Sequence, residues 1–182
     1  MVRDDWVLGG GRRTAAADRI YAAATELVIR HGFDAFDIDT LAAQVHCSRA
    51  TIYRYAGGKA QIRDAVLVRL SADITDTVRR AVDGLSGPER VVVAITVALE
   101  QMRSDPIRRL IRTSSNSPEL GELLASPMLA HLAAELTGIT DADPQAAQWI
   151  VRVVVSLAYW PAGSRRVEQQ LLRRFVAPAF KA

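Results

Sequence analysis

The sequence contains little that would cross-link the chain or hold it in a membrane. Cys47 is the single cysteine among 182 residues, so no internal disulfide can form, and a reducing cytosol is the expected compartment. The longest apolar run, Val91 to Leu99, is interrupted by Thr96 and falls short of the roughly 20 residues that span a bilayer. The N-terminal MVRDDW lacks the apolar core of a signal peptide. We therefore expect a cytoplasmic protein without a membrane partner.

Residue groups typical of metal sites and enzyme active sites are also missing. The histidines His31, His46 and His131 are scattered, and neither histidine nor cysteine recurs at metal-ligand spacing. There is no nucleophile elbow, no phosphate-binding glycine loop and no zinc-protease motif. The glycines from Gly9 to Gly11 do not follow a predicted strand, so they do not indicate a dinucleotide site. We expect no metal, no cofactor and no enzymatic activity.

The composition favours a helical protein with a sizeable core. Hydrophobic residues make up 49% of the chain and aromatic residues only 6%, which is typical of an Ala- and Val-rich all-α fold. Residues 1–14 contain three glycines and no sustained period, so we predict an N-terminal arm there. A first helix is predicted over about 15–31, with Gly32 as its stop.

Residues 37–59 contain two short helices separated by about three residues. Asp37 is placed to cap the first, whose inward positions are Ile38, Leu41, Ala42 and Val45. Ser48 is placed to cap the second. Cys47 falls between the two helices. We expect it to close the turn as a small apolar core side chain, and we favour this role over that of a redox sensor. This spacing predicts a helix-turn-helix.

The second of these helices has a polar, positively charged outer face. Ile52 and Ala56 are four residues apart and predicted to face inward, which leaves an outward face for the major groove of DNA. That face consists of Arg49, Ala50, Tyr53 and Arg54. From residue 44 to residue 63 the charged residues are all cations, namely Arg49, Arg54, Lys59 and Arg63. The alternative is a set of ordinary solvated cations beside two structural tyrosines.

At this point the sequence resembles the tetracycline-repressor (TetR) family of bacterial transcription regulators. The resemblance runs from about residue 19 to residue 66 and rests on Gly32-Phe33, Leu41-Ala42, Ser48, Thr51, Tyr53, Lys59 and Ala65-Val66. It implies a DNA-binding set of Ser48, Arg49, Ala50, Thr51, Tyr53, Arg54, Tyr55 and Lys59. Within this set it implies that Arg49 and Ala50 lie at base edges, and that Thr51, Tyr53, Tyr55 and Lys59 lie at or near phosphates.

The chain departs from the family pattern in three places. Asp37 and Asp39 stand where the family favours a hydroxyl and often a cation, and Tyr55 stands where it often has a histidine. Residues 56–58, Ala-Gly-Gly, replace a phenylalanine followed by a polar turn. Because acidic groups repel phosphate, we expect no phosphate contact from the first turn of the helix that begins near Asp37.

The remainder of the chain is predicted to form a second helical domain. We assign residues 15–60 to the DNA-binding domain and residues 61–182 to an effector-binding and dimerisation domain. A long helix is predicted from about residue 60 to residue 83. Further helices are predicted to begin near Pro88, Pro106, Pro127 and Pro144, because each proline fits a first helical turn. A last helix is predicted to begin near Arg165.

Two adjacent apolar helices near the C-terminus predict a four-helix homodimer interface, which is also where the resembled family pairs its subunits. The predicted interface residues are Ile150, Val151, Val154, Leu157, Ala158, Leu172 and Phe175. A pocket for a small, largely apolar effector is predicted around Leu99, Met102, Arg103, Arg112 and Trp149.

The predicted function is that of a homodimeric repressor that binds a palindromic operator in double-stranded DNA and is released by that effector. The alternative is a helical ligand- or partner-binding module without operator-specific repression. Competition experiments separate the repressor from the binding module. DNA binding by a repressor is competed by one operator and only poorly by random duplex.

Overall fold

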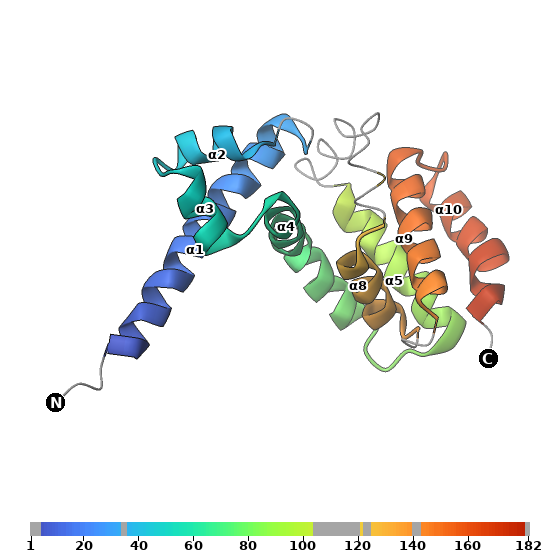
Figure 1. Cartoon of the computed structure of the whole chain (residues 1–182). Coiled ribbons are helices and arrows are strands. Elements are labelled where there is room, and N and C mark those ends of the chain that lie inside the picture. The colour runs from blue at the N-terminus through green and yellow to red at the C-terminus, as the bar shows by residue number, and fades with distance from the viewer. Residues whose placement is uncertain (1–4, 34–35, 104–120, 122–124, 140–142, 181–182) are drawn as a thin grey trace. The chain divides into compact units, whose positions relative to one another are not determined.

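The computed structural model describes residues 5–33, 36–103, 121, 125–139 and 143–180, and it describes side chains from Arg13 onward. Every regular element in these ranges is a helix, which confirms the predicted all-α fold (Figure 1). The chain divides into two compact units, residues 1–70 and residues 71–182. None of the helices in the described ranges is long and apolar enough to cross a membrane.

The first unit is built from four helices. They are α1 (Asp5–His31), α2 (Ile38–Gln44), α3 (Arg49–Ala56) and the beginning of α4 (Lys59–Ala81). α1 contacts both α2 and α3, and these two contact each other. Each helix contributes buried apolar side chains, including Ala24, Val28, Leu41, Ile52, Ile62 and Val66. Burial of a Val, Leu or Ile side chain stabilises by about 1.5–3 kcal/mol, so this small core holds α3 firmly in place.

The start of α1 differs from the sequence prediction. The helix begins at Asp5 rather than near Ala15, so most of the predicted N-terminal arm is helical. A glycine in a helix interior costs only about 1 kcal/mol relative to alanine. Each residue added to an existing helix also gains a backbone hydrogen bond. The glycines from Gly9 to Gly11 therefore weaken α1 locally without ending it.

The boundary between the two compact units lies after Leu70. Ile62 and Val66 of α4 are fully buried, and Arg69 donates a 2.7 Å hydrogen bond to Asp18 of α1. The first turns of α4 thus pack with α1 as part of the first unit, while the later turns belong to the second unit.

In its described residues the second unit contains four α-helices after α4 and two C-terminal turns of other types. They are α5 (Gly87–Met102), α8 (Pro127–Thr137), α9 (Pro144–Tyr159), α10 (Arg165–Leu171), the π-helical η1 (Leu172–Val176) and the 3-10 η2 (Ala177–Phe180). Pro88, Pro127 and Pro144 lie in the first turns of their helices, as predicted. The helix predicted after Asp105-Pro106 lies outside the described residues.

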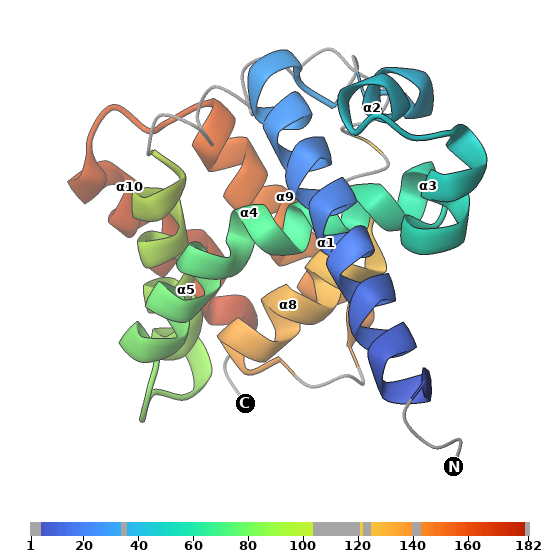
Figure 2. The ribbon, with the colours of Figure 1, turned by 90° about the vertical axis from the view of Figure 1, so that its left-hand side faces the viewer.

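α5 is the central helix of the second unit. It contacts α8, α9, η1 and η2, and Figures 1 and 2 show α8 lying beside it. One side of α5 buries Ile95 and Leu99 against Ile150 and Leu172. Its other side buries Ala94 in a cluster with Val78, Val82 and Leu136. The second unit therefore has a continuous apolar interior built around α5.

Candidate nucleic-acid interface

α3 has the capping and burial pattern of a helix held in one orientation. The Ser48 hydroxyl accepts a 3.2 Å hydrogen bond from the backbone N–H of Thr51 and lies 2.9 Å from the Thr51 hydroxyl. Ile52 and Ala56 are buried against the rest of the unit. The hydroxyl of Tyr21 on α1 donates a 3.2 Å hydrogen bond to the carbonyl oxygen of Ala56. Both ends of α3 are thus fixed.

Tyr21 was not among the candidate residues because its role depends on a long-range contact. It is separated from Ala56 by 35 positions, and no periodic pattern links the two. Its position on α1 beside the buried Ile20 offers only a weak signal. The structure identifies it as a support of the helix-turn-helix.

The outer face of α3 is exposed, as its sequence pattern predicts. Arg49, Ala50, Tyr53 and Arg54 are all exposed, and Tyr53 presents 51% of its surface to solvent. Their positions on one short helix place two guanidinium groups and a phenol on the same surface. Guanidinium and phenol groups are donors to phosphate and to base edges, so this face has the chemistry of a DNA-contacting surface.

Arg49 is the first residue of α3 and forms an ion pair with α2. Its Nε lies 3.3 Å from Oδ1 of Asp39, and the two side chains are 61% and 69% exposed. An exposed pair of this kind contributes little to stability. Its significance lies in where it holds the guanidinium, at the N-terminal end of the helix that presents the outer face.

Arg54 and Tyr55 form a second local arrangement. The Arg54 guanidinium lies 4.7 Å from the centre of the Tyr55 ring, and its Nη2 donates a 3.2 Å hydrogen bond to the Tyr55 hydroxyl. The two side chains therefore restrict each other's rotamers. Both lie in the last turn of α3, at the opposite end from Arg49.

Asp37 caps α2 and lies within electrostatic range of Lys59, the first residue of α4. Its carboxylate accepts hydrogen bonds from the Thr40 hydroxyl (2.6 Å) and the Thr40 backbone N–H (2.8 Å). These two bonds, with a smaller contribution from the charge of Lys59, lower the pKa of Asp37 below its ordinary value. The carboxylate is thus committed to the helix cap.

The turn between α2 and α3 is more open than the sequence suggests. His46 has a positive φ of 55°, a conformation that an L-residue adopts at some cost. Val45 and Cys47 are partly exposed. The prediction that Cys47 is a buried core side chain is therefore wrong. The cysteine thiol lies 3.5 Å from the carbonyl oxygen of Ser48. The turn is closed by α2 and α3 themselves rather than by Cys47.

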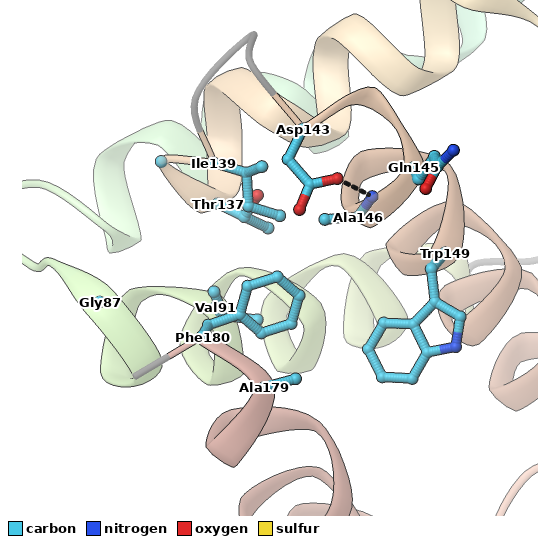
Figure 3. Close-up of a pocket in the computed structure, with 11 residues that line it drawn as sticks. Gly87, Val91, Thr137, Ile139, Asp143, Gln145, Ala146, Trp149, Ala179 and Phe180 are labelled. Atoms are coloured by element: carbon cyan, nitrogen blue, oxygen red, sulfur yellow. Dashed lines mark hydrogen bonds between the residues drawn. The ribbon is translucent and has the colours of Figure 1, made fainter. Parts of the chain in front are cut away.

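The second unit contains a cavity of about 550 Å³ between α5, α8, α9 and η2 (Figure 3). Its apolar walls come mainly from Val91, Ile139, Trp149 and Phe180, and its polar groups include Asp143 and Gln145. The rings of Trp149 and Phe180 lie 6.1 Å apart at 32°. Oδ1 of Asp143 accepts the capping hydrogen bond from Ala146 N–H (2.9 Å). Apolar and polar groups thus line this open cavity together, as they do in sites for small molecules.

Comparison with known proteins agrees with this geometry. Residues 20–66 match the model of the family described as bacterial regulatory proteins, tetR family. An uncharacterised HTH-type transcriptional regulator of Mycobacterium tuberculosis strain H37Rv is 31% identical over 98% of this chain and 91% of its own length. The chain belongs to the TetR family. It is a transcriptional regulator with a helix-turn-helix DNA-binding domain.

Other relatives support the TetR assignment over different lengths. The DNA-binding transcriptional repressor TetR of Mycobacteroides abscessus is 39% identical over 72 residues, which are 40% of this chain and 36% of that repressor. Among solved structures, the repressor QsdR of R. erythropolis has a TM-score of 0.60 at 20% identity, covering 91% of this chain and 94% of its own. The repressor AlkX of a Dietzia strain has a TM-score of 0.53 at 20% identity, covering 88% and 92%. At this level of identity the structural likeness concerns the fold.

Of the predicted effector residues that the structure of this TetR-family chain describes, Trp149 alone lines this cavity. Trp149 lines the cavity beside Val91, whereas Arg103 lies twelve residues further along α5, a rise of about 18 Å. Leu99 is part of the core, and Arg103 is bound to Glu168 of α10. The partly buried Met102 is the last residue of α5, and Arg112 lies outside the described residues. Helical spacing predicted that these residues face inward, but it did not show whether they lie in the packed core or at a cavity.

The predicted dimer-interface residues of this TetR-family chain fall into two groups. Ile150, Val151 and Leu172 are buried within the protomer, so they stabilise its own core and are not available to a partner. Val154, Leu157 and Ala158 are partly buried against that core. Phe175, by contrast, is 62% exposed. The surface that remains for a partner is therefore narrower than the sequence pattern indicated.

Three exposed apolar residues that the interface prediction omitted lie close to Phe175 in the sequence. Val167 and Leu171 precede it at spacings of four residues, and Trp160 is exposed just before α10. Trp160 packs edge-on against Tyr159, with ring centres 4.3 Å apart. Leu171 was recognised in the sequence as an apolar residue of the last helix but was not assigned to the interface, and Val167 was not recognised.

Proposed function

We propose that this regulator is a homodimeric repressor that binds a near-palindromic operator and is released from it by a small, largely apolar effector. The observation that carries the proposal is the outer face of α3. Arg49, Tyr53 and Arg54 are exposed together on a helix whose other side is fixed by Ile52 and Ala56. The N-terminal residues of such a helix contact base edges in the major groove.

Phosphate contacts are assigned to residues around this face. Ser48, Thr51, Tyr53 and Tyr55 carry hydroxyl groups, and Lys59 carries a charge at the start of the next helix. Such contacts supply sequence-independent affinity and set the register of the protein on the duplex. Arg49 and Ala50, at the N-terminus of α3, are the residues assigned to base edges.

Dimerisation is proposed through the stripe formed by Val167, Leu171 and Phe175, together with the outer side of α9. An exposed apolar stripe that repeats every four residues along a helix is costly in water and favours a second helix against it. Because α9 and α10 are adjacent in sequence, two copies pairing there give a four-helix arrangement. A two-fold dimer presents two α3 helices to half-sites about 34–36 Å apart, or a multiple of this.

The effector is proposed to bind in the cavity lined by Trp149 and Phe180. α8 connects this cavity to α4, because Thr137 and Gly138 line it while the preceding Glu135 accepts two hydrogen bonds from Arg79. Leu136 also packs with Val78 and Val82 near the end of α4. α4 begins at Lys59, so a shift of α8 acts on a helix whose first residue is assigned to DNA.

The energetics of release follow from linkage. An effector that prefers the conformer with wrongly spaced α3 helices by about 1–3 kcal/mol weakens operator binding by roughly five- to 150-fold. Operator DNA must weaken effector binding by the same factor. Equal effector affinities with and without saturating operator would contradict the regulatory mechanism.

The test of operator binding is selection of bound genomic fragments followed by footprinting. We expect a protected site with dyad symmetry, competed by the same duplex and poorly by random duplex. A footprint without a dyad would contradict the dimeric mode of binding. Absence of sequence preference would instead favour a helical ligand- or partner-binding module that uses the motif only as a scaffold.

A further inference from the structure

Asp39 is an acidic residue on the same side of the helix-turn-helix as the surface proposed to face DNA. A carboxylate there repels phosphate, so its presence calls for a compensating role. The cap of α2 does not require it, because Asp37 already accepts the hydrogen bonds from Thr40. The one contact that the described residues give Asp39 outside its own helix is the ion pair with Arg49.

The geometry of that ion pair determines which part of Arg49 remains available. The contact joins Oδ1 of Asp39 to Nε of Arg49, at 3.3 Å. Nε is the inner nitrogen of the guanidinium, so the two terminal nitrogens, Nη1 and Nη2, are left at the outer end of the side chain. With 61% of the side chain exposed, these terminal groups are accessible to a ligand. A pair of parallel N–H donors is the geometry that recognises O6 and N7 of guanine.

We propose that Asp39 is a specificity-determining residue that positions Arg49, so that its terminal nitrogens contact a guanine in each half-site of the operator. This inference rests on the proposed operator binding. Arg49 is long and flexible, and an unrestrained arginine at the start of α3 has many rotamers that reach phosphates instead of bases. Asp39 removes part of that freedom before DNA is bound, at the expense of some repulsion from the phosphates.

Two variants at position 39 separate the positioning role from the charge. Asp39→Asn and Asp39→Ala both remove the negative charge, but asparagine keeps a polar side chain of the same size beside Arg49. Both variants should therefore bind random-sequence duplex more tightly than the wild type, and to the same extent. Only Asp39→Ala should lose the preference for guanine strongly, by roughly two- to fivefold, the range expected for an exposed ion pair. The asparagine variant should show a smaller loss.

The probe is a duplex selected from a random library by the wild-type chain, together with duplexes that carry each base pair at the position Arg49 contacts. Competition titrations give the ratio of affinities for guanine and for the other bases. Glu26→Gln is a matched control, because Glu26 pairs with Arg30 in an exposed i,i+4 contact within α1. The control should leave that ratio unchanged.

A double-mutant comparison makes the test specific to Arg49. In an Arg49→Ala background, Asp39→Ala should raise affinity for all duplexes equally and leave the remaining base preferences unaltered. A role of Asp39 in stabilising α2 alone would instead lower the free energy of unfolding and leave the guanine ratio of folded protein intact.

The outcomes separate the inference from the function on which it rests. A wild-type chain that shows no preference between the selected and random duplexes overturns both. A wild type with a clear preference, together with an Asp39→Ala variant whose guanine ratio is unchanged, overturns the positioning role alone. Loss of guanine preference in Asp39→Ala, with partial retention in Asp39→Asn, supports it.

Discussion

Nη2 of Arg103, at the end of α5, donates 2.7 Å hydrogen bonds to both carboxylate oxygens of Glu168 on α10. The partners differ in burial, since the Glu168 side chain is 3% exposed and that of Arg103 is 33% exposed. Removing the arginine leaves a buried carboxylate unpaired. Removing the glutamate leaves an arginine side chain that is one-third exposed, although its Nη1 is buried without a hydrogen-bond partner among the described residues. The two halves of this ion pair are therefore unequal.

Arg103→Met should lower the free energy of unfolding by about 3 kcal/mol, because it leaves a buried carboxylate unpaired. Glu168→Leu should lower it by less, about 1 kcal/mol, since the remaining Arg103 side chain is 33% exposed and is partly screened by solvent. Urea unfolding at fixed protein concentration measures both. Arg165→Met is the control, because Arg165 and Glu100 join the same two helices through an exposed 3.3 Å contact. Equal losses for the two variants at the buried pair would contradict the asymmetry.

Arg49→Ala should relax base preference at one position of the operator and cost about 1–3 kcal/mol there. Lys59→Ala should instead weaken binding to all duplexes and lower the slope of log affinity against log salt by about one unit. Fluorescence anisotropy titrations on operator and random duplex at several salt concentrations distinguish the two. If Arg49→Ala loses the same amount on both duplexes, Arg49 contacts phosphate.

Phe175→Glu should dissociate the proposed dimer without unfolding the protomer, because the side chain is already exposed. A charge placed in an apolar interface is desolvated without a partner, which opposes association. Val154 and Leu157 are less suitable for this test, since they also pack on the protomer's core. Light scattering should report a monomer for Phe175→Glu and a dimer for Gln169→Glu, an exposed position between the members of the stripe. A dimer in both would place the interface elsewhere.

Trp149→Ala should weaken effectors that release the operator by roughly 10- to 100-fold, since an apolar wall of this size contributes about 1.5–3 kcal/mol when covered. Such compounds are found by screening for loss of anisotropy of a labelled operator. Trp160→Ala, a tryptophan outside the lining of the cavity, should leave their potency unchanged. Unchanged potency in Trp149→Ala would show that effectors bind elsewhere.

Asp37 should make the stability of the first unit depend on acid pH. The pKa of Asp37 is lowered in the folded chain, mainly by hydrogen bonds from Thr40. The resulting stability is fully present above the unfolded-state pKa of about 3.8 and is lost as pH falls through the lower, folded value. The difference in unfolding free energy between the wild type and Asp37→Asn should therefore be constant at neutral pH and shrink in acid. A difference that does not change with pH would contradict this.

The sequence predicted best those features that depend on a few neighbouring residues. Ser48 and Asp143 cap the helices that follow them, and Pro127 begins α8, because caps and first-turn prolines act within one helical turn. Ile52 and Ala56 face inward for the same reason, since helical geometry alone fixes which residues share a side. The caps and inward faces of α2 and α3 were therefore predicted, whereas the start of α1 was placed near Ala15 instead of at Asp5.

Features that depend on the packing of distant segments were predicted less well. Helical periodicity shows that Ile150 and Phe175 both belong to apolar faces. It does not show whether another helix of the same protomer or a second chain packs against each face. Ile150 is buried in its own core and Phe175 is exposed. Likewise, the pairing of Asp39 with Arg49 depends on side-chain rotamers across the turn between α2 and α3. The sequence alone showed only that Asp39 is an acidic residue that repels phosphate.

Gly138 restricts how the cavity can diversify among descendants of this chain. It has a positive φ of 73°, and a Cβ added there would lie 3.0 Å from Cδ of Arg90, whose guanidinium binds the carbonyl oxygens of Leu136 and Glu135. Any side chain at position 138 would be strained by the positive φ, and the Arg90 side chain would have to shift by a few tenths of an ångström to accommodate it. The exposed Gln145 and Ala179 carry no such constraint. Substitutions that change the ligand preference are therefore expected at positions such as Gln145 and Ala179, while Gly138 at the end of α8 is retained.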